Sequence, residues 1–489
     1  MRKVFYVTLL MVLLKDAAIH FAASVEGVAP IPIGSRLELF VDRFLIEKMD
    51  GTRLQLHEPV PAGTAIPFDR PWEGSFSAYV TVLKDGRTYR MYYRGTPDAG
   101  GDSSNLEVTC YAESVDGKTW IKPELGFYEV RGTRKNNVIL ANIPPFTGNF
   151  SPFLDVNPAA PTIERFKALA GNSVSGLFPF VSADGVRWRK KGNRPVLTDG
   201  AFDSQNVSFW SEAEQCYLCY FRTWSNRIEG GNGIRTVSRA RSADFFVWSK
   251  PESMDFGGTP MEHIYTNQTT PYFRAPHIYL ALPMRFMPGR KVLSEEQAKA
   301  LGVSPNYKSD CADAVFMSSR GGNRYDRTFM EGFIRPGTDA GNWASRAGLL
   351  ALGIVPTGET EISIYKQAHY AQPSAHLVRY TLRTDGFASV NAPYADGEFS
   401  TKVLTFRGKG LVINYSTSAA GSFRVQIEND AGAPLPGYTL ADSDEIVGDS
   451  IERIVHWKTG SDVSALAGKP VRLRFAMKDA DLYSFRFRE

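Results

Sequence analysis

A short motif that recurs along most of the chain constrains the fold more than any other feature. Ser182-Ala-Asp-Gly-Val-Arg-Trp188 and Ser114-Val-Asp-Gly-Lys-Thr-Trp120 share a serine, an Asp-Gly pair and a tryptophan at the same spacing. Weaker copies begin at Ser242, Ser319 and Thr384. Equivalent positions in successive copies are 60 to 77 residues apart, which suits repeats of one supersecondary unit with variable loops. The chain is therefore predicted to contain five similar units.

The residues of the motif indicate a hairpin. Asp-Gly supplies the positive φ that a tight turn requires, and the aromatic residue can pack beneath that turn. The segments between the turns are strand-like, and four strands per repeat is typical of a propeller. Aromatic residues make up 12% of the chain, which also has 43 glycines and 29 prolines, as expected for a turn-rich all-β protein. We therefore predict an all-β fold that begins with a five-bladed β-propeller.

The pattern changes after Ala392, where six short strand-like segments follow one another with turn signals between them. This pattern predicts a C-terminal β-sandwich over residues 395–489, after a propeller over residues 35–391. The strand-like run 36–46 precedes the first repeat, and we expect it to close the propeller by joining the last blade.

The N-terminus has the pattern of an export signal. Arg2 and Lys3 precede an apolar run over residues 5–14, and small residues follow at 22–24. This predicts a signal peptide over residues 1–24 and a periplasmic or extracellular protein. The apolar run is too short to span a bilayer, so no stable membrane insertion is expected.

Charge and cysteine content exclude several classes of function. The 56 basic and 52 acidic residues are spread along the chain without a basic stripe, so nucleic acid is not an expected partner. Of the four cysteines, Cys216 and Cys219 lie on one strand-like run and would face opposite sides of it. No metal site and no cofactor are predicted, although export leaves one disulfide open.

The repeated turn resembles the Asp-box hairpin of sialidase-like propellers, in which it is structural and lies away from the active site. A five-bladed propeller followed by a sandwich resembles the invertase and fructanase glycoside hydrolases. The propeller alone resembles the arabinanases and xylosidases and the mannoside phosphorylases. The invertase signature W-x-N-D-P-N-G is absent, and Asp155-Val-Asn-Pro158 matches only loosely the Arg-Asp-Pro of the second blade. The resemblance therefore implies an architecture and a carbohydrate substrate, and it transfers no nucleophile.

Candidate site residues follow from that architecture, because the first strand of each blade lines the central axis and delivers polar side chains to one funnel. Glycoside hydrolysis needs two carboxyl groups. We predict catalytic roles for Glu73, Asp155 and Asp203, with Glu73 or Asp203 as the acid. The predicted substrate-binding residues are Arg70, Trp210, Arg274, His277, Asp313, Trp343 and Arg346. The alternative for each carboxylate is that it caps a turn through its own backbone.

These residues predict an exported glycoside hydrolase that acts on a polysaccharide or oligosaccharide. The arginines could bind hydroxyl groups or an anionic substituent such as sulfate or uronate. Two alternatives remain: a glycoside phosphorylase, in which phosphate replaces water, and a non-catalytic glycan-binding propeller. The sequence leaves open the sugar, its linkage, the stereochemical outcome and the oligomeric state.

Overall fold

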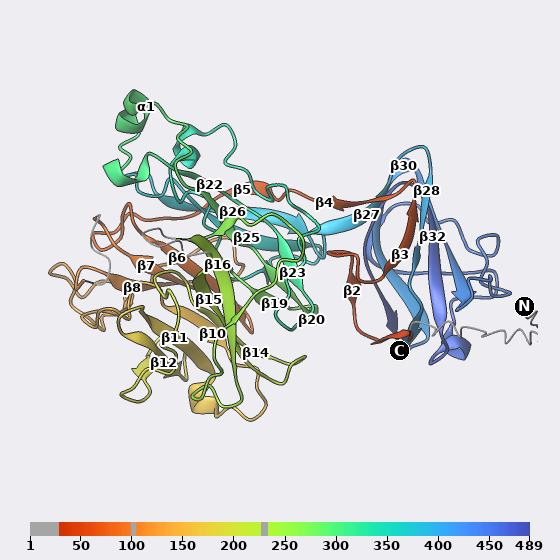
Figure 1. Cartoon of the computed structure of the whole chain (residues 1–489), viewed down its shortest axis with the longest axis horizontal. Helices are drawn as coiled ribbons and strands as arrows, with labels where there is room; N and C mark the ends of the chain where they lie inside the picture. Colours follow the sequence, from red (N-terminus) through yellow and green to blue (C-terminus); the bar gives the residue numbers. More distant parts are fainter. Residues whose placement is uncertain (1–28, 99–103, 226–232) are drawn as a thin grey trace, which may run out of the picture.

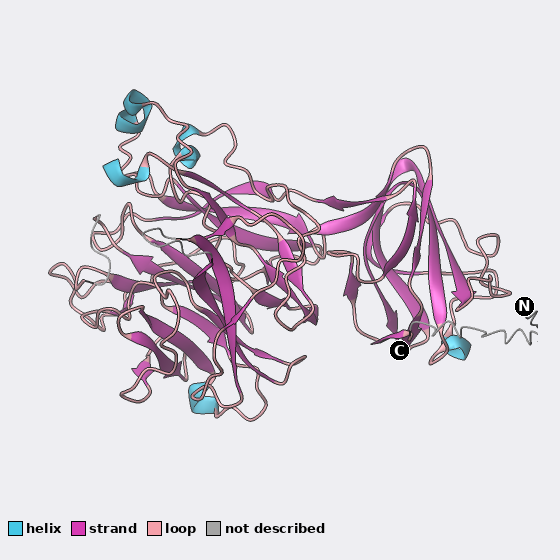
Figure 2. Cartoon of the chain, in the orientation of Figure 1, coloured by secondary structure: helices cyan, strands magenta, loops and turns pink. Residues whose placement is uncertain are grey.

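The computed structural model describes residues 29–98, 104–225 and 233–489. Strands dominate it, and they form two bodies, a propeller and a β-sandwich that contains the C-terminal strands (Figures 1 and 2). The prediction of an all-β fold with a propeller followed by a sandwich is confirmed. The predicted signal peptide lies outside the described residues.

The propeller consists of antiparallel sheets that follow one another along the chain. The first contains β6 (Ala78–Asp85), β7 (Thr88–Gly95), β8 (Val108–Ser114) and β9 (Val138–Leu140). The second contains β10 (Ser151–Leu154), β11 (Phe166–Asn172), β12 (Gly176–Ser182) and β13 (Arg189–Lys190). The third contains β14 (Val207–Ser211), β15 (Cys216–Ser225), β16 (Ile234–Ser242) and β17 (Glu252–Ser253).

The next part of the chain forms two three-stranded sheets in place of one four-stranded sheet. One contains β18 (His263–Ile264), β21 (Met284–Met287) and β22 (Cys311–Ala314). The other contains β19 (Thr270–Tyr272), β20 (Ala275–Ala281) and β23 (Met317–Ser319). Because these sheets are not one four-stranded unit, the number of five blades stays a prediction.

The last propeller sheet combines residues from the two ends of the propeller sequence. It contains β24 (Val355–Pro356), β25 (Glu361–Ala368), β26 (His376–Arg383) and the N-terminal strand β5 (Val60–Pro67), which pairs with β26. The expectation that residues 36–46 close the propeller was wrong. In that run, β2 (Glu38–Leu39) pairs instead with the C-terminal strand β32 (Val471–Arg488).

The repeated motif forms the same turn three times. In the copy after β8, the Ser114 hydroxyl accepts a hydrogen bond from the Gly117 amide at 2.9 Å, and Asp116 Oδ1 accepts from the next two amides at 2.7 and 2.8 Å. The copies around Asp184 and Asp244 have the same pattern. The residue that follows the aspartate in each copy, Gly117, Gly185 or Phe245, has φ between 70° and 74°. In the third copy this residue is Phe245, although a positive φ favours glycine.

The sandwich sheet includes four strands from the N-terminal part of the chain as well as the C-terminal strands. The long strands β30 (Gly410–Asn429) and β32 pair along most of their length. The other members from the C-terminal part are β27 (Ala388–Ala392), β28 (Gly397–Thr401), β29 (Leu404–Phe406) and β31 (Asp449–Ile454). The N-terminal members are β1 (Ile31–Gly34), β2, β3 (Ile46–Asp50) and β4 (Arg53–Leu56). The predicted propeller, which begins at residue 35, therefore included β2, β3 and β4, although these strands pair with strands of the sandwich sheet. The sequence of a strand does not show which other strand it will pair with.

Helices are few among the described residues. The α-helix α1 (Glu295–Ala300) follows the N-cap Ser294, which forms a capping box with Gln297, and lies in an insertion between β21 and β22. Short 3₁₀ turns are η1 (Thr162–Glu164), η2 (Pro305–Tyr307), η3 (Ala340–Trp343) and η4 (Ser464–Leu466). In the described part of the chain, no helix has the length and apolar character needed to cross a membrane.

Candidate functional site

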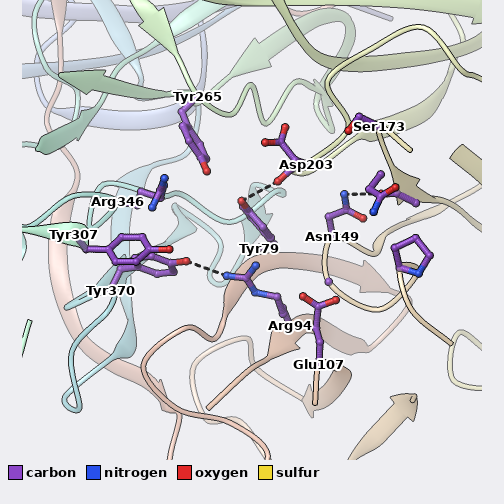
Figure 3. Close-up of a pocket in the computed structure, with 14 residues that line it drawn as sticks. Tyr79, Arg94, Glu107, Asn149, Ser173, Asp203, Tyr265, Tyr307, Arg346 and Tyr370 are labelled. Carbon is purple, nitrogen blue, oxygen red and sulfur yellow. Dashed lines mark hydrogen bonds between the residues drawn. The ribbon is translucent and has the colours of Figure 1, made fainter. Parts of the chain in front are cut away.

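A cavity of about 290 Å³ collects polar side chains from every sheet region of the propeller (Figure 3). We call it the central cavity. Its charged and aromatic lining comprises Tyr79, Arg94, Glu107, Asp203, Tyr265, Tyr307, Arg346 and Tyr370, and Asn149 is among its further lining residues. These residues are more than two hundred positions apart at the extremes, so only the propeller geometry brings them together.

Residues that precede inner strands supply much of this lining. Asn149 lies just before β10, Asp203 before β14 and Tyr265 before β19. Residues ahead of three different inner strands therefore line the same cavity. Asp155 and Arg274 follow inner strands, so they lie at the opposite strand ends and do not line the cavity.

Two carboxyl groups line the central cavity. The Asp203 side chain is 56% exposed and forms an ion pair with Arg222. The Glu107 side chain is buried, and Thr147 Oγ1 donates a hydrogen bond to its Oε1 at 3.1 Å. Gly148 lies so close to Glu107 that any side chain there would collide with the carboxylate. The cavity therefore offers one accessible carboxylate and one buried carboxyl group in a fixed position.

Three guanidinium groups surround the Tyr265 ring. Their central carbons lie 4.9 Å (Arg222), 5.1 Å (Arg346) and 5.6 Å (Arg235) from the ring centroid. Burial and the positive charges of Arg222 and Arg346 lower the pKa of Arg235. Among the described residues, Arg222 Nε and Nη1 and Arg346 Nε have no hydrogen-bond partner although they are buried. This cluster has hydrogen-bond donors and positive charge available for a ligand.

The hydroxyl of Tyr265 points into the central cavity (Figure 3). Burial alone would raise the pKa of Tyr265, but the charges of Arg346 and Arg222 lower it below its ordinary value. The cavity is therefore strongly positive at this point.

Strained backbone accompanies these side chains. Tyr79 has φ of 53°, a left-handed conformation that is unusual for a bulky residue, and its hydroxyl donates to the Asp203 carbonyl at 3.3 Å. Ser345 and Ala371, which adjoin the cavity residues Arg346 and Tyr370, have φ of 34° and 63°. Such strain is often found at functional sites, where the surrounding structure enforces it.

Of the predicted catalytic residues, only Asp203 lines the central cavity. Glu73 is buried and accepts hydrogen bonds from Lys122 at 2.6 Å and Tyr93 at 2.7 Å. Asp155 follows β10 and is buried in an ion pair with Lys167, and the Tyr217 hydroxyl donates to it at 2.8 Å. The structure does not bring these two carboxylates to Asp203, because each is held by a lysine within its own part of the fold.

The predicted binding residues are divided among several places. Arg346 lines the central cavity, whereas Asp313 and Trp343 line a second cavity nearby. Arg274 follows β19 and pairs with Asp385 at 3.0 Å and with Glu452, and His277 contacts Glu38 at 3.2 Å. Both therefore lie where the propeller meets sandwich strands, away from the central cavity.

The remaining two candidates lie elsewhere in the propeller. Arg70 is exposed beside Asp69, and Trp210 is buried in an edge contact with Tyr217 at 4.9 Å between ring centroids. Neither lines the central cavity.

Sequence reasoning missed Glu107, Arg94, Arg222 and Tyr265. Arg94 and Arg222 belong to β7 and β15, the second strands of their sheets, which the prediction did not consider. Tyr265 could have been found from its position before an inner strand. In the described residues, no group of three or more His, Cys, Asp or Glu side chains could hold a metal ion.

No protein-family model matches the sequence, and no curated protein matches it. Similar solved structures include a Bombyx mori GH32 β-fructofuranosidase, at 10% identity and a TM-score of 0.43, with 87% of this chain and 94% of that chain covered. An N-acetylgalactosamine deacetylase from F. plautii in complex with blood group B trisaccharide has 13% identity and a TM-score of 0.42, covering 69% and 95%. A structure from the GH130 family of mannoside phosphorylases, which contains glycoside hydrolases, has 14% identity and a TM-score of 0.37, covering 72% and 96%. These likenesses are too distant to assign an activity to this chain.

Proposed function

We propose that this protein is an exported glycoside hydrolase whose carboxyl pair is Asp203 and Glu107. The observation that supports this most directly is that both carboxyl groups line one polar cavity at the centre of the propeller. Paired carboxyl groups flanking a glycosidic bond are the usual machinery of glycoside hydrolysis. Glu107 is thus proposed as the second carboxyl group of the pair, a role that the sequence had suggested for Glu73 or Asp155.

The two carboxyl groups have different surroundings, and we assign different roles on that basis. Asp203 is accessible and forms an ion pair with Arg222, which suits a base that activates water or a nucleophile that attacks the anomeric carbon. Proton donation to the leaving oxygen then falls to Glu107. The bond from the anomeric carbon to that oxygen breaks as the new bond to water or Asp203 forms.

The substrate is proposed to be a carbohydrate with an anionic group. Arg222, Arg235 and Arg346 place three positive charges around Tyr265, and Asp203 pairs with only one of them, Arg222. A carboxylate or sulfate would satisfy the buried guanidinium donors of Arg222 and Arg346. A neutral sugar would leave this charge uncompensated.

The same arginines favour a second candidate function, glycoside phosphorolysis. Inorganic phosphate could occupy the guanidinium cluster and attack the anomeric carbon in place of water, so that a single carboxyl group from the protein would suffice. Assays with and without phosphate separate the two, because a phosphorylase releases a sugar phosphate.

The test is a screen of the purified protein against neutral, carboxylated and sulfated polysaccharides, with product sugars identified. On a substrate found in this way, Asp203→Asn and Glu107→Gln should each reduce kcat at least about a hundredfold. Asp199→Asn is the matched control, because Asp199 is exposed, four residues away and outside the cavity lining. Full activity in either cavity variant would refute the assigned pair.

Export is tested separately from catalysis. The full-length protein should lose its first residues, up to about position 24, when it is expressed with a secretion pathway. Sequencing the N-terminus of the recovered protein measures this directly, and an intact Met1 in an exported sample would contradict the proposal.

A further inference from the structure

A second cavity, of about 500 Å³, lies beside the sheet formed by β18, β21 and β22. We call it the insertion cavity, because Arg290 reaches it from the insertion that carries α1. The residues that define its chemistry are Met287, Arg290, Asp313, Arg335, Pro336 and Trp343. It is larger than the central cavity, and the carboxyl pair proposed above does not line it.

Trp343 forms a fixed aromatic wall of the insertion cavity. Its indole Nε1 donates a hydrogen bond to the Gly337 carbonyl at 2.8 Å. It also packs against the small apolar cluster of the insertion, which includes Leu293 and Ala298. The insertion therefore supports Trp343 in place while part of the side chain lines the cavity, an arrangement that suits stacking with a sugar ring.

The charges around the insertion cavity do not balance. Arg285 binds Asp313 through two hydrogen bonds, of 2.9 and 2.5 Å, and contacts Glu262 at 2.8 Å. Glu262 also pairs with Arg327. The two carboxylates are thus occupied by two internal arginines.

Arg290 and Arg335 remain on the rim of the insertion cavity. Both are exposed, and within the described ranges neither side chain has a hydrogen bond or an ion pair with a carboxylate. Counted with Glu262, Asp313 and Arg285, the other charged residues that line the cavity, they leave it with one uncompensated positive charge. Exposed guanidinium groups beside an aromatic wall are suited to an acidic saccharide.

One short segment contributes a residue to each of the two cavities. Trp343 lines the insertion cavity and Arg346 lines the central cavity, so their Cα atoms lie within about 11 Å of each other. The Ser345 amide between them donates to the Asp310 carbonyl at 2.8 Å, which ties the segment to the end of the insertion. One ligand chain could therefore contact both places.

We infer that the insertion cavity is a second binding site, which takes an acidic sugar unit of the same glycan that the central cavity cleaves. Trp343 stacks on the sugar ring, and Arg290 and Arg335 bind its carboxylate or sulfate. The identification of the ligand as part of the substrate rests on the proposed function, whereas the binding of an acidic saccharide does not.

The experiment measures binding by titration calorimetry with the full-length protein. The probes are trigalacturonic acid, which carries carboxylates, a sulfated carrageenan tetrasaccharide, and neutral maltotriose. To confine the measurement to the insertion cavity, all variants carry Arg346→Ala, which removes a guanidinium from the central cavity. Within this background, Arg290→Ala with Arg335→Ala is compared with the matched pair Arg194→Ala and Arg407→Ala, two exposed arginines elsewhere.

Binding of at least one acidic probe, weakened at least tenfold by the Arg290 and Arg335 changes and less than twofold by the control pair, is the expected result. Trp343→Ala should weaken the same binding. The inference is overturned if neither acidic probe binds at millimolar concentration, if maltotriose binds equally well, or if the control pair weakens binding as much. Full activity of Asp203→Asn together with intact probe binding would refute the proposed carboxyl pair alone. Loss of activity in Asp203→Asn without binding of either acidic probe would refute this inference alone.

Discussion

Lys366 offers a test of how burial affects stability in the propeller. The side chain belongs to β25, is only 2% exposed, and lies on the same strand face as the buried Ile362 and Ile364. Among the described residues, no hydrogen bond or ion pair holds its ammonium group. Burial lowers the pKa of Lys366 from 10.5 to about 8, although the charge of Asp339 opposes this change.

The magnitude of the effect follows from this pKa. The difference between 10.5 and about 8 corresponds to a cost of about 3 kcal/mol in the free energy of unfolding. This is the cost of burying the protonated lysine. Because the unfolded state binds more protons between these pH values, the stability of the wild-type protein should rise as the pH increases from about 8 to 10.5. Below about pH 8 the full penalty applies.

Lys366→Met keeps the length of the side chain and removes the charge. We expect it to raise the free energy of unfolding at pH 7 by up to about 3 kcal/mol, and to lose this advantage toward pH 10.5. Urea unfolding followed by circular dichroism at several pH values measures both effects. Lys469→Met, at an exposed position, is the control and should change stability little. A Lys366→Met protein that gains nothing at pH 7, or gains equally at every pH, would refute the reasoning.

Three further predictions concern Tyr265 in the central cavity, Glu73 elsewhere in the propeller, and a loop of the sandwich. The tyrosinate absorption of the wild-type protein should begin at lower pH than that of Tyr265→Phe, because Arg346 and Arg222 lower the pKa of Tyr265; identical titration curves would contradict this. Glu73→Gln should destabilise the protein by about 3 kcal/mol in urea unfolding, since Lys122 loses a buried partner, while kcat per folded molecule stays unchanged. A large loss of kcat would contradict this prediction and indicate a catalytic role for Glu73. Neutralising three acidic residues of a sandwich loop together should change kcat less than about tenfold. These residues are Asp442, Asp444 and Glu445.

The repeated turn was predictable because its hydrogen bonds join residues that are close in sequence. Ser114, Asp116 and the amides that they bind lie within five positions of one another, so the motif itself contains the structure. The pairing of β5 with β26 was not predictable in this way. These strands are more than three hundred residues apart, and many strand-like segments of the chain would have suited the same edge equally well.

The candidate site was predicted in part, and two of the errors have the same physical cause. Asp203 and Arg346 were found because they precede inner strands, whereas Asp155 and Arg274 follow the inner strands β10 and β19. Sequence shows that a carboxylate is near a strand end, but it does not show which end opens on the cavity. Glu73 precedes an inner strand and still misses the cavity, because Lys122, which is 49 residues away, binds it elsewhere.

The guanidinium cluster explains why the rest of the site was missed. Arg222 and Arg235 lie on neighbouring strands, β15 and β16, whose sequences alone would suggest that arginines there face solvent. In the structure they are drawn together around Tyr265 with Arg346, although like charges in a buried place reduce stability. A fold selected only for stability would separate or pair these charges. Their juxtaposition, beside strained backbone at Tyr79 and Ser345, is the feature that supports the proposed anionic substrate, which would compensate these charges when it binds.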